Sequence, residues 1–166
     1  MVFGKLEKHI DEINRALKSP GLLLVSGFES PNIMAVHWAA FGCLWGKPVF
    51  ITAVKRARRT YELLENSGVL TVNVPRKDIT QEIMKISLAS GHEADTFTEF
   101  NLHPVKAKNI NTYIVSDCNI HLECRVIYKS PVNGAALCEK IKKETYDGGS
   151  NYHTLFFGEI LDIYET

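Results

Sequence analysis

The sequence predicts a mainly β fold, a closed or split antiparallel barrel with peripheral helices. From residue 119 onward, apolar side chains alternate with polar ones such as His121 and Glu123, which is the period-two pattern of a half-buried strand. Other apolar runs of strand length are bounded by glycine or proline. These runs lack the regular strand–helix alternation of a doubly wound fold. An antiparallel barrel is therefore favoured.

The first half of the chain predicts a leading helix followed by strands. Residues 5–17 carry leucine and isoleucine at intervals of three and four, which is one apolar helical face, and Pro20 and Gly21 follow its end. Residues 22–28 and 47–54 are apolar runs of strand length, and residues 32–48 continue the apolar pattern. A brief helix is predicted at 60–68, ended by Gly68, and a β-branched strand at 69–75.

The second half predicts one more long helix, a short one and two long strands. Asp78 and Gln81 resemble a capping box that opens a helix over 79–90, with an end near Gly91. A long antiparallel strand begins at 119, a short helix is expected within 134–149, and residues 152–164 form the last strand. Gly158 suggests a bulge or tight bend there. We expect one domain over 1–166, with a helix at 5–17 and the barrel at about 20–165.

Composition and charge exclude several partners. Among 166 residues, 19 basic and 19 acidic side chains cancel, which gives no reason to propose nucleic acid or an anionic membrane. The N-terminus lacks the apolar core of a signal peptide, and no run is long enough to span a bilayer, so a soluble, cytoplasmic protein is expected. The four cysteines, which show no Cys-x-x-Cys spacing, are interpreted as reduced packing residues: Cys43, Cys118, Cys124 and Cys138.

A basic cluster precedes the predicted helix at 60–68. Lys55, Arg56, Arg58 and Arg59 lie between a strand end and Thr60. Helix amides, the helix dipole and bidentate arginine together make a good phosphate receptor. The alternative is a solvated basic turn.

The segment 32–48 is apolar but rich in alanine and glycine, which suggests that something approaches its backbone closely. Asn73 and Ser90 lie near predicted strand and helix ends, where they can hydrogen-bond the edge of a planar heterocycle. The alternative is a packed strand with two ordinary turns.

Other catalytic motifs are missing from the sequence. The histidines form no His-Glu-x-x-His pattern, and only His121 and Glu123 share a strand face at close spacing, so no metal site is predicted. No Gly-x-Ser-x-Gly, P-loop or Gly-x-Gly-x-x-Gly occurs. Acyl transfer, NTP hydrolysis and a Rossmann-type dinucleotide site therefore lack support.

Taken in order, several segments resemble the flavin reductase-like family of FMN-binding split barrels, which includes flavoredoxin. The resemblance covers most of residues 20–161 and runs through PGLLLVSG, NIMAVHWAAFGC, KPVFITAVKRARRT, GVLTVNVP, the SG of residues 90–91, HLECRV and YHTLFFGEIL. The LEC strand and the terminal H-T-L-F-x-G-E are its most specific parts. They favour this branch over a pyridoxamine phosphate oxidase-like barrel.

The resemblance implies an antiparallel split β-barrel that binds FMN. It implies that no side chain acts as a catalytic proton donor, and that His153 is a candidate for orienting a nicotinamide. Many relatives carry a basic residue and then a lysine soon after the SG, whereas this chain has His92 and Thr96. The implied flavin contacts are Arg56, Arg59 and Thr60 for the phosphate, Asn32, Ala35, Ala40 and Cys43 for the ring, and Asn73 and Ser90 as further contacts.

The resemblance further implies an NAD(P)H-dependent flavin reductase. Hydride would pass from NADH or NADPH to flavin N5, and electrons would leave to an unidentified small-molecule or protein acceptor. Family members are usually homodimers with FMN near the interface, so a homodimer is expected. The alternative is a flavoredoxin-like FMN electron carrier that a partner protein reduces. A third interpretation is a barrel that binds another planar ligand or serves only in dimerisation.

Overall fold

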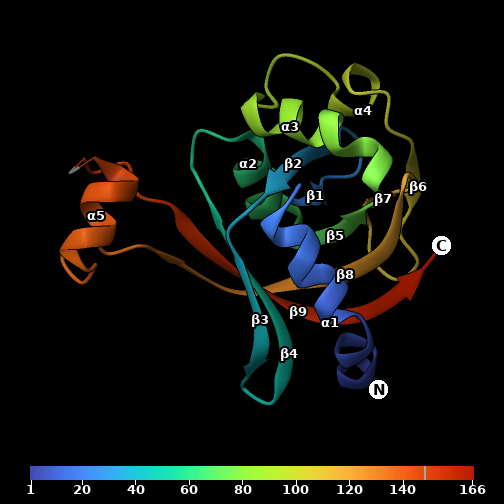
Figure 1. The fold of residues 1–166 in the computed structure, drawn as a ribbon, viewed down its shortest axis with the longest axis horizontal. Helices are drawn as coiled ribbons and strands as arrows, with labels where there is room; N and C mark the ends of the chain where they lie inside the picture. The colour runs from blue at the N-terminus through green and yellow to red at the C-terminus, as the bar shows by residue number, and fades with distance from the viewer. Residues whose placement is uncertain (148) are drawn as a thin grey trace.

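One antiparallel sheet forms the body of the molecule. The computed structural model describes residues 1–147 and 149–166, the side chain of Lys77 excepted. Within these residues, seven strands pair in the order β2-β1-β5-β8-β9-β4-β3 (Figure 1). Their bounds are β1 Leu22–Ser26, β2 Asn32–Val36, β3 Ala39–Leu44, β4 Lys47–Val54, β5 Val69–Pro75, β8 Cys118–Pro131 and β9 Thr154–Glu165.

The sheet is a split barrel, because its two edge strands are consecutive in the chain. β2 and β3 lie at opposite edges of the sheet order, yet only His37 and Trp38 separate them in sequence. All strand pairs are antiparallel. The sheet must therefore curl until its edges approach each other at His37 and Trp38. The expected antiparallel split barrel is confirmed.

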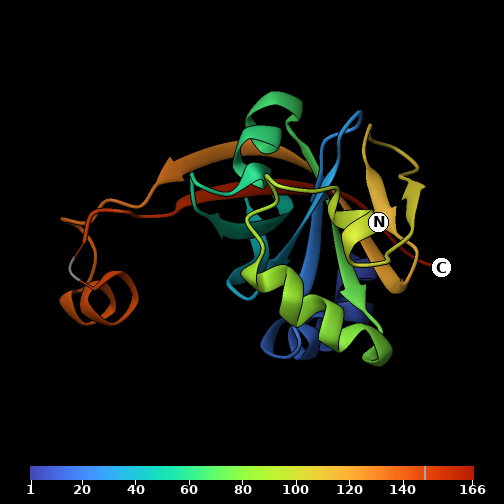
Figure 2. The ribbon, with the colours of Figure 1, turned by 90° about the horizontal axis from the view of Figure 1, so that it is seen from above.

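Except for α5, the helices lie around this barrel (Figure 2). The helix α1 packs against β1, β5 and β9, and α3 and α4 both pack against β2. A small hairpin, β6 Pro104–Lys106 with β7 Tyr113–Val115, lies against β1 and β5. The bounds of the helices are α1 Val2–Lys18, α2 Arg59–Ser67, the 3-10 turn η1 Lys77–Ile79, α3 Thr80–Leu88, α4 Thr96–Glu99 and α5 Glu139–Tyr146.

The strand β1 is buried on both faces and separates two hydrophobic clusters. Leu22 and Leu24 belong to the cluster inside the barrel, which α1 closes with residues such as Ile13. Leu23 and Val25 face the opposite way and pack under α3 and α4. Burying such a side chain contributes about 1.5–3 kcal/mol. A run of apolar residues without alternation is what a strand covered on both faces requires.

The strand β8 differs from the half-buried strand that its alternation predicts. Its polar face is also buried, because β7 and the residues that precede it cover His121 and Glu123. The Glu123 carboxylate accepts hydrogen bonds from the backbone amides of Lys108 (2.6 Å) and Asn109 (2.8 Å) and from the Tyr164 hydroxyl (2.7 Å). These donors compensate the burial of the charge.

Several local expectations are refined by the structure. The leading helix begins at Val2 rather than at residue 5. The segment 32–48 forms β2 and β3, with a break at residues 37–38, and the first two residues of β4. The capping box is wrong: α3 follows a 3-10 turn, its N-cap is Ile79, and no side-chain hydrogen bond caps it. The irregularity expected at Gly158 is confirmed, because the β8–β9 register shifts beside it. A Cβ at Gly158 would lie 3.0 Å from the Cys124 Cβ.

The four cysteines are free, but only two of them are packing residues. Cys118 and Cys124 are buried, and burial raises the pKa of both thiols. Cys43 and Cys138 are exposed, which corrects the expectation that all four pack inside the protein. Cys43 lies on β3 and Cys138 at the start of α5, and neither element is covered at that point.

The connection between β8 and β9 forms an arm that carries α5 away from the barrel (Figures 1 and 2). The β8–β9 pairing extends to Pro131 and Thr154, and there β4 still pairs with β9 on its other side. No residue of α5 is buried. The expected short helix within 134–149 is thereby confirmed.

The buried side chain of His121 should make the stability of the fold sensitive to acid. Its Nδ1 lies 2.7 Å from Asn73 Oδ1, and burial together with the charge of Lys108 lowers the pKa of His121 to about 4. Because the unfolded chain takes up this proton first, folding stability is full above pH 6.5 and is lost as pH falls toward 4. Between pH 6.5 and 4.5, His121 should lower the free energy of unfolding by about 2 kcal/mol. Urea denaturation at both pH values should show a correspondingly smaller loss in His121→Gln, whereas equal losses would contradict this assignment.

Candidate functional site

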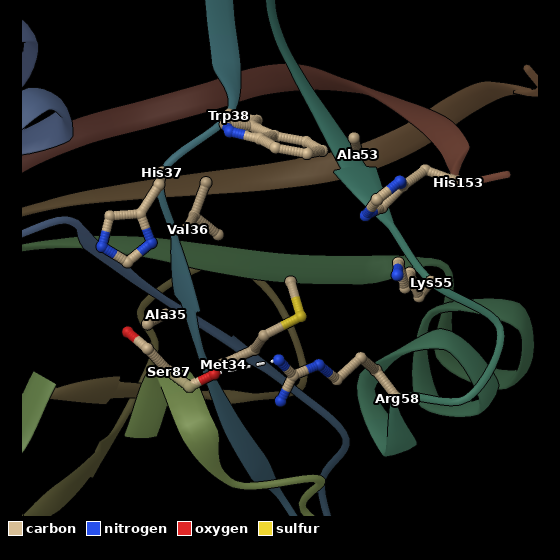
Figure 3. A pocket seen from close by; sticks show the side chains of 10 residues that line it. All are labelled: Met34, Ala35, Val36, His37, Trp38, Ala53, Lys55, Arg58, Ser87 and His153. Carbon is tan, nitrogen blue, oxygen red and sulfur yellow. Dashed lines mark hydrogen bonds between the residues drawn. The ribbon is translucent and has the colours of Figure 1, made fainter. Parts of the chain in front are cut away.

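A cleft opens beside the break between β2 and β3. It has a volume of about 410 Å³, within the range of about 300–1,000 Å³ that is typical of small-molecule sites. Its walls come from β2, the end of β4, the end of α3 and the residue before β9 (Figure 3). The lining residues are Met34, Ala35, Val36, His37, Trp38, Ala53, Lys55, Arg58, Ser87 and His153.

Strand geometry explains how β4 contributes to this cleft. Ala53 and Lys55 point to one side, while Val54 between them is buried in the barrel. Ala35 of β2 and Ala53 of β4 are small, so they leave room for a flat ligand between them. Part of the segment 32–48, which is rich in small residues, therefore lines a cavity.

Arg58 forms the basic wall of the cleft and is held in place by α3. Its Nη2 donates to the Ser87 carbonyl at 3.0 Å, and its Nη1 donates to the Ala89 carbonyl. A cation at the C-terminal end of a helix satisfies free carbonyls and complements the helix dipole. Arg58 therefore joins the β4–α2 connection to the end of α3 and fixes one side of the cleft.

A buried hydrogen-bond network lies behind this wall. Asn32 is 2% exposed, and its Nδ2 donates to Thr60 Oγ1 at 2.9 Å. Thr96 Oγ1 donates to Asn32 Oδ1 at 3.3 Å, and the Ile33 amide donates to Thr96 Oγ1 at 3.0 Å. A Cβ at Gly91, where φ is +84°, would lie 2.6 Å from Asn32 Oδ1. Only glycine permits this close approach without displacing Asn32.

The start of α2 is tied to the same network. The Arg59 amide donates to the Ser90 carbonyl at 3.3 Å, and Arg59 Nη2 donates to Ser30 Oγ at 2.5 Å. Thr60 lies in the first turn of α2 and is fully buried. Arg59, Thr60, Asn32 and Ser90 therefore form one unit next to the cleft, although they come from three separate segments.

His153 lies at the mouth of the cleft beside Trp38. The two ring centroids are 5.0 Å apart, and His153 Nδ1 lies 3.0 Å from the Tyr146 hydroxyl (Figure 3 shows His153 and Trp38). Burial and the positive charges of Lys55 and Arg58 lower the pKa of His153. The imidazole is therefore neutral near pH 7, with one donor and one acceptor nitrogen.

Comparison with known proteins identifies the family. The family model described as "Flavin reductase like domain" matches residues 15–166. The chain belongs to this family. This family member is 28% identical to an uncharacterized protein of Archaeoglobus fulgidus over 141 residues, which cover 85% of the chain and 69% of that protein.

Solved structures with the same fold include two flavoproteins. Flavoredoxin of Desulfovibrio vulgaris (Miyazaki F) superposes with a TM-score of 0.70 at 23% identity, covering 89% of this chain and 69% of that one. The NADH:FAD oxidoreductase SgcE6 of Streptomyces globisporus C-1027 superposes with a TM-score of 0.65 at 16% identity, covering 88% and 75%. At these identities the likeness shows the fold alone.

Not all residues implied by the flavin reductase-like resemblance gather at the cleft. Ala35 and His153 line it, and Ala40 borders a small neighbouring hollow that Trp38 and Ala53 share. Cys43 lies four residues beyond Ala39, near the turn of the β3–β4 hairpin, and is exposed. The structure therefore does not bring Cys43 to this cleft.

Two other implied contacts are engaged elsewhere. The Asn73 amide donates to the Leu23 carbonyl and to Thr71 Oγ1, and its Oδ1 accepts from the Val115 amide and lies 2.7 Å from His121 Nδ1. These bonds leave it no free group for a ligand. Arg56 is exposed, and its guanidinium lies 5.8 Å from the centroid of the Tyr61 ring.

Residues that the resemblance did not select line the cleft as well. Lys55 and Arg58 belong to the basic cluster recognised in the sequence, and alternation along β4 was the signal that places Ala53 and Lys55 on the cleft side. No pattern in the sequence indicated that Trp38 and Ser87 line the cleft, because their position there depends on how β2 and α3 pack together.

The departure after Ser90 and Gly91 also has a structural explanation. His92 Nε2 donates to the Ala57 carbonyl at 3.1 Å, and Thr96 completes the Asn32 network. His92 therefore holds the 90–96 loop against the β4–α2 connection, and Thr96 holds it against β2. Within residues 1–147 and 149–166, no group of three or more His, Cys, Asp or Glu side chains is arranged to hold a metal ion. In the same part of the chain, no helix combines the length and apolarity needed to cross a bilayer.

Asn32→Ala should weaken the whole protein, since it leaves the buried Thr60 and Thr96 hydroxyls without their shared partner. We expect the free energy of unfolding to fall by about 2 kcal/mol. Urea denaturation followed by tryptophan fluorescence measures this, with the exposed Asn66→Ala as the matched control, which should change by less than about 0.5 kcal/mol. Equal effects of the two substitutions would show that the network is not stabilising.

Proposed function

We propose that the protein binds FMN in this cleft and acts as an NAD(P)H-dependent flavin reductase. The observation that carries the proposal is the joining of a cleft, lined by Ala35 and Ala53, to a basic wall whose Arg58 is the N-cap residue of α2. A planar ring fits between small residues, while an anionic phosphate is favoured by cations and by the dipole of a helix N-terminus. Membership of the flavin reductase-like family supports the same conclusion.

The chemistry of the residues present fits FMN better than an uncharged flavin. Thr60 and Arg59 open α2, and Lys55 and Arg58 extend the positive charge along the cleft wall. We assign the phosphate to this end and the ring to the side of Ala35, with Asn32 and Ser90 holding the loop behind it. Arg56 has a smaller role, because its side chain points toward Tyr61.

The protein itself needs to supply position and charge. The redox chemistry, hydride uptake from a reduced nicotinamide followed by electron release to an acceptor, is supplied by FMN when it is bound. The neutral ring of His153 lies at the mouth of the cleft beside Trp38, where it can orient a nicotinamide. We assign no side chain as a proton donor.

An FMN electron carrier is the second candidate. His92 and Thr96 occupy positions where many relatives carry cations, and both are engaged within the protein. At these two positions, neither described side chain is a free cation that could bind the phosphates of a dinucleotide. The structural likeness to flavoredoxin is compatible with this alternative.

Arg59→Ala should weaken FMN binding without changing riboflavin binding, because only FMN carries a phosphate. Loss of a charge-assisted hydrogen bond of about 1.5–3 kcal/mol corresponds to a dissociation constant raised at least tenfold. Flavin fluorescence titration measures both ligands, and Arg56→Ala is the matched control, with an expected change of less than threefold. Equal weakening of riboflavin and FMN by Arg59→Ala would contradict the phosphate assignment.

Anaerobic mixing of the FMN-loaded protein with NADH or NADPH separates the two candidate functions. A reductase should bleach the flavin absorbance in a single turnover with at least one of the two nucleotides. A carrier should stay oxidised with both, although dithionite still reduces it. That second result would replace the reductase assignment by the carrier.

We further propose a homodimer. Leu88 is 88% exposed and Met84 is 63% exposed, and both lie in an apolar hollow that shares His37 and Ser87 with the cleft. Apolar side chains exposed next to a site are typical of an interface. Sedimentation at micromolar concentration should give twice the mass of one chain, and Leu88→Glu should shift it toward the monomer. A monomeric wild-type protein would contradict the proposal.

A further inference from the structure

One side chain of the arm that carries α5, Tyr146, contacts a residue that lines the cleft. Tyr146, the last residue of α5, places its hydroxyl 3.0 Å from His153 Nδ1, and the two ring centroids lie 5.6 Å apart. Tyr152 supports Tyr146 from the other side, with ring centroids 4.8 Å apart. The end of an otherwise exposed helix is thus tied to a residue of the candidate site.

This contact determines which nitrogen of His153 serves the cleft. Nδ1 is occupied by Tyr146, so Nε2 is the ring nitrogen left for a ligand. Among the residues that the structure describes, no group hydrogen-bonds Nε2. The ring is also confined by Trp38, whose centroid lies 5.0 Å away. In Figure 3, the ring of His153 lies between Trp38 and Lys55.

The surrounding charges and the Tyr146 hydroxyl together select the tautomer. Lys55 and Arg58 line the same cleft and, with burial, lower the pKa of His153, so the imidazole is neutral near pH 7. In a neutral imidazole, one nitrogen carries the proton and the other a lone pair. Two cations on the cleft side favour the lone pair on Nε2 over an N–H dipole pointing at them. Nδ1 then carries the proton, and this N–H donates a hydrogen bond to the Tyr146 hydroxyl oxygen.

We propose that Tyr146 is a positioning residue that holds His153 with its Nε2 lone pair toward the cleft, where it accepts an N–H from the carboxamide of a nicotinamide. This inference rests on the proposed reductase function for the identity of the ligand. The positioning itself concerns only residues of this chain. Tyr146 is not among the residues that line the cleft, so its hydroxyl would act through the His153 ring.

Nitrogen-15 NMR of the histidine rings in the flavin-free protein tests the positioning without any activity. At pH 8, wild-type His153 should show a protonated Nδ1 and an unprotonated Nε2. Tyr146→Phe keeps the ring packing but removes the hydroxyl, so His153 should become a mixture of both tautomers. Tyr152→Phe is the matched control and should leave His153 unchanged, since within the described residues the Tyr152 hydroxyl makes no hydrogen bond. Identical His153 spectra in wild type and Tyr146→Phe would overturn the proposal.

Steady-state kinetics test the ligand. Tyr146→Phe should raise KM for NADH about fivefold while kcat changes less than twofold, because one hydrogen bond to the bound nicotinamide is weakened. The reduced 3-acetylpyridine analogue of NADH has a methyl ketone in place of the carboxamide and so lacks the N–H. Its KM should be the same in wild type and in Tyr146→Phe. An equal rise for both nucleotides would overturn the carboxamide assignment.

The two measurements separate this inference from the proposed function. If neither nucleotide reduces the FMN-loaded protein, the reductase function and the nicotinamide ligand both fail. The NMR result still decides whether Tyr146 positions His153. If reduction occurs but the tautomer is insensitive to Tyr146→Phe, the proposed function stands and the positioning role is wrong.

Discussion

The side-chain amide of Asn32 joins three segments that lie far apart in the sequence. It contacts Thr60 at the start of α2, Thr96 at the start of α4, and the backbone of Gly91. A buried amide without partners is costly, so each of these contacts stabilises the arrangement of the three segments. Once they are formed, the start of α2 faces the edge strand β2 and the cleft acquires its basic side. The geometry of the candidate site therefore depends on one buried polar residue more than on any apolar contact.

Much of the fold follows from local patterns in the sequence. The alternation after residue 119, the two-sided apolar run of β1 and the glycine at 158 predict strands and an irregularity where the structure has them. Other features depend on tertiary contacts that no local pattern records. His121 and Glu123 alternate like solvent-facing residues but are buried, because a short hairpin covers them. The strands of that hairpin, β6 and β7, are too short to give a recognisable alternation in the sequence. At Asp78, a 3-10 turn forms in place of the predicted capping box.

The sequence predicted the kinds of residue at the candidate site, basic and small side chains, but not all of the residues that line it. The basic cluster and the small residues of segment 32–48 do meet at one cleft, since strand alternation directs Ala53 and Lys55 to the same side. Asn73 was predicted to contact the ligand, but its amide is fully used within the protein. Its partners Leu23, Val115 and His121 lie on other strands, so the sequence around Asn73 does not reveal them. Tyr146 had no signal, because no helix or strand pattern indicates its contact with His153, seven residues further along the chain. Residues whose partners lie outside their own helix or strand are the ones that local patterns miss.

A crystal structure of the protein with FMN would locate the cofactor. We expect the ring in the cleft beside Ala35 and Ala53 and the phosphate at the start of α2, next to Arg59 and Thr60. The molecule offers a contrasting position, a cavity of about 520 Å³ between the end of α1 and the end of β5 that Arg15 and Arg76 line. FMN bound there, or no bound FMN at saturating concentration, would show that the cleft is not the flavin site.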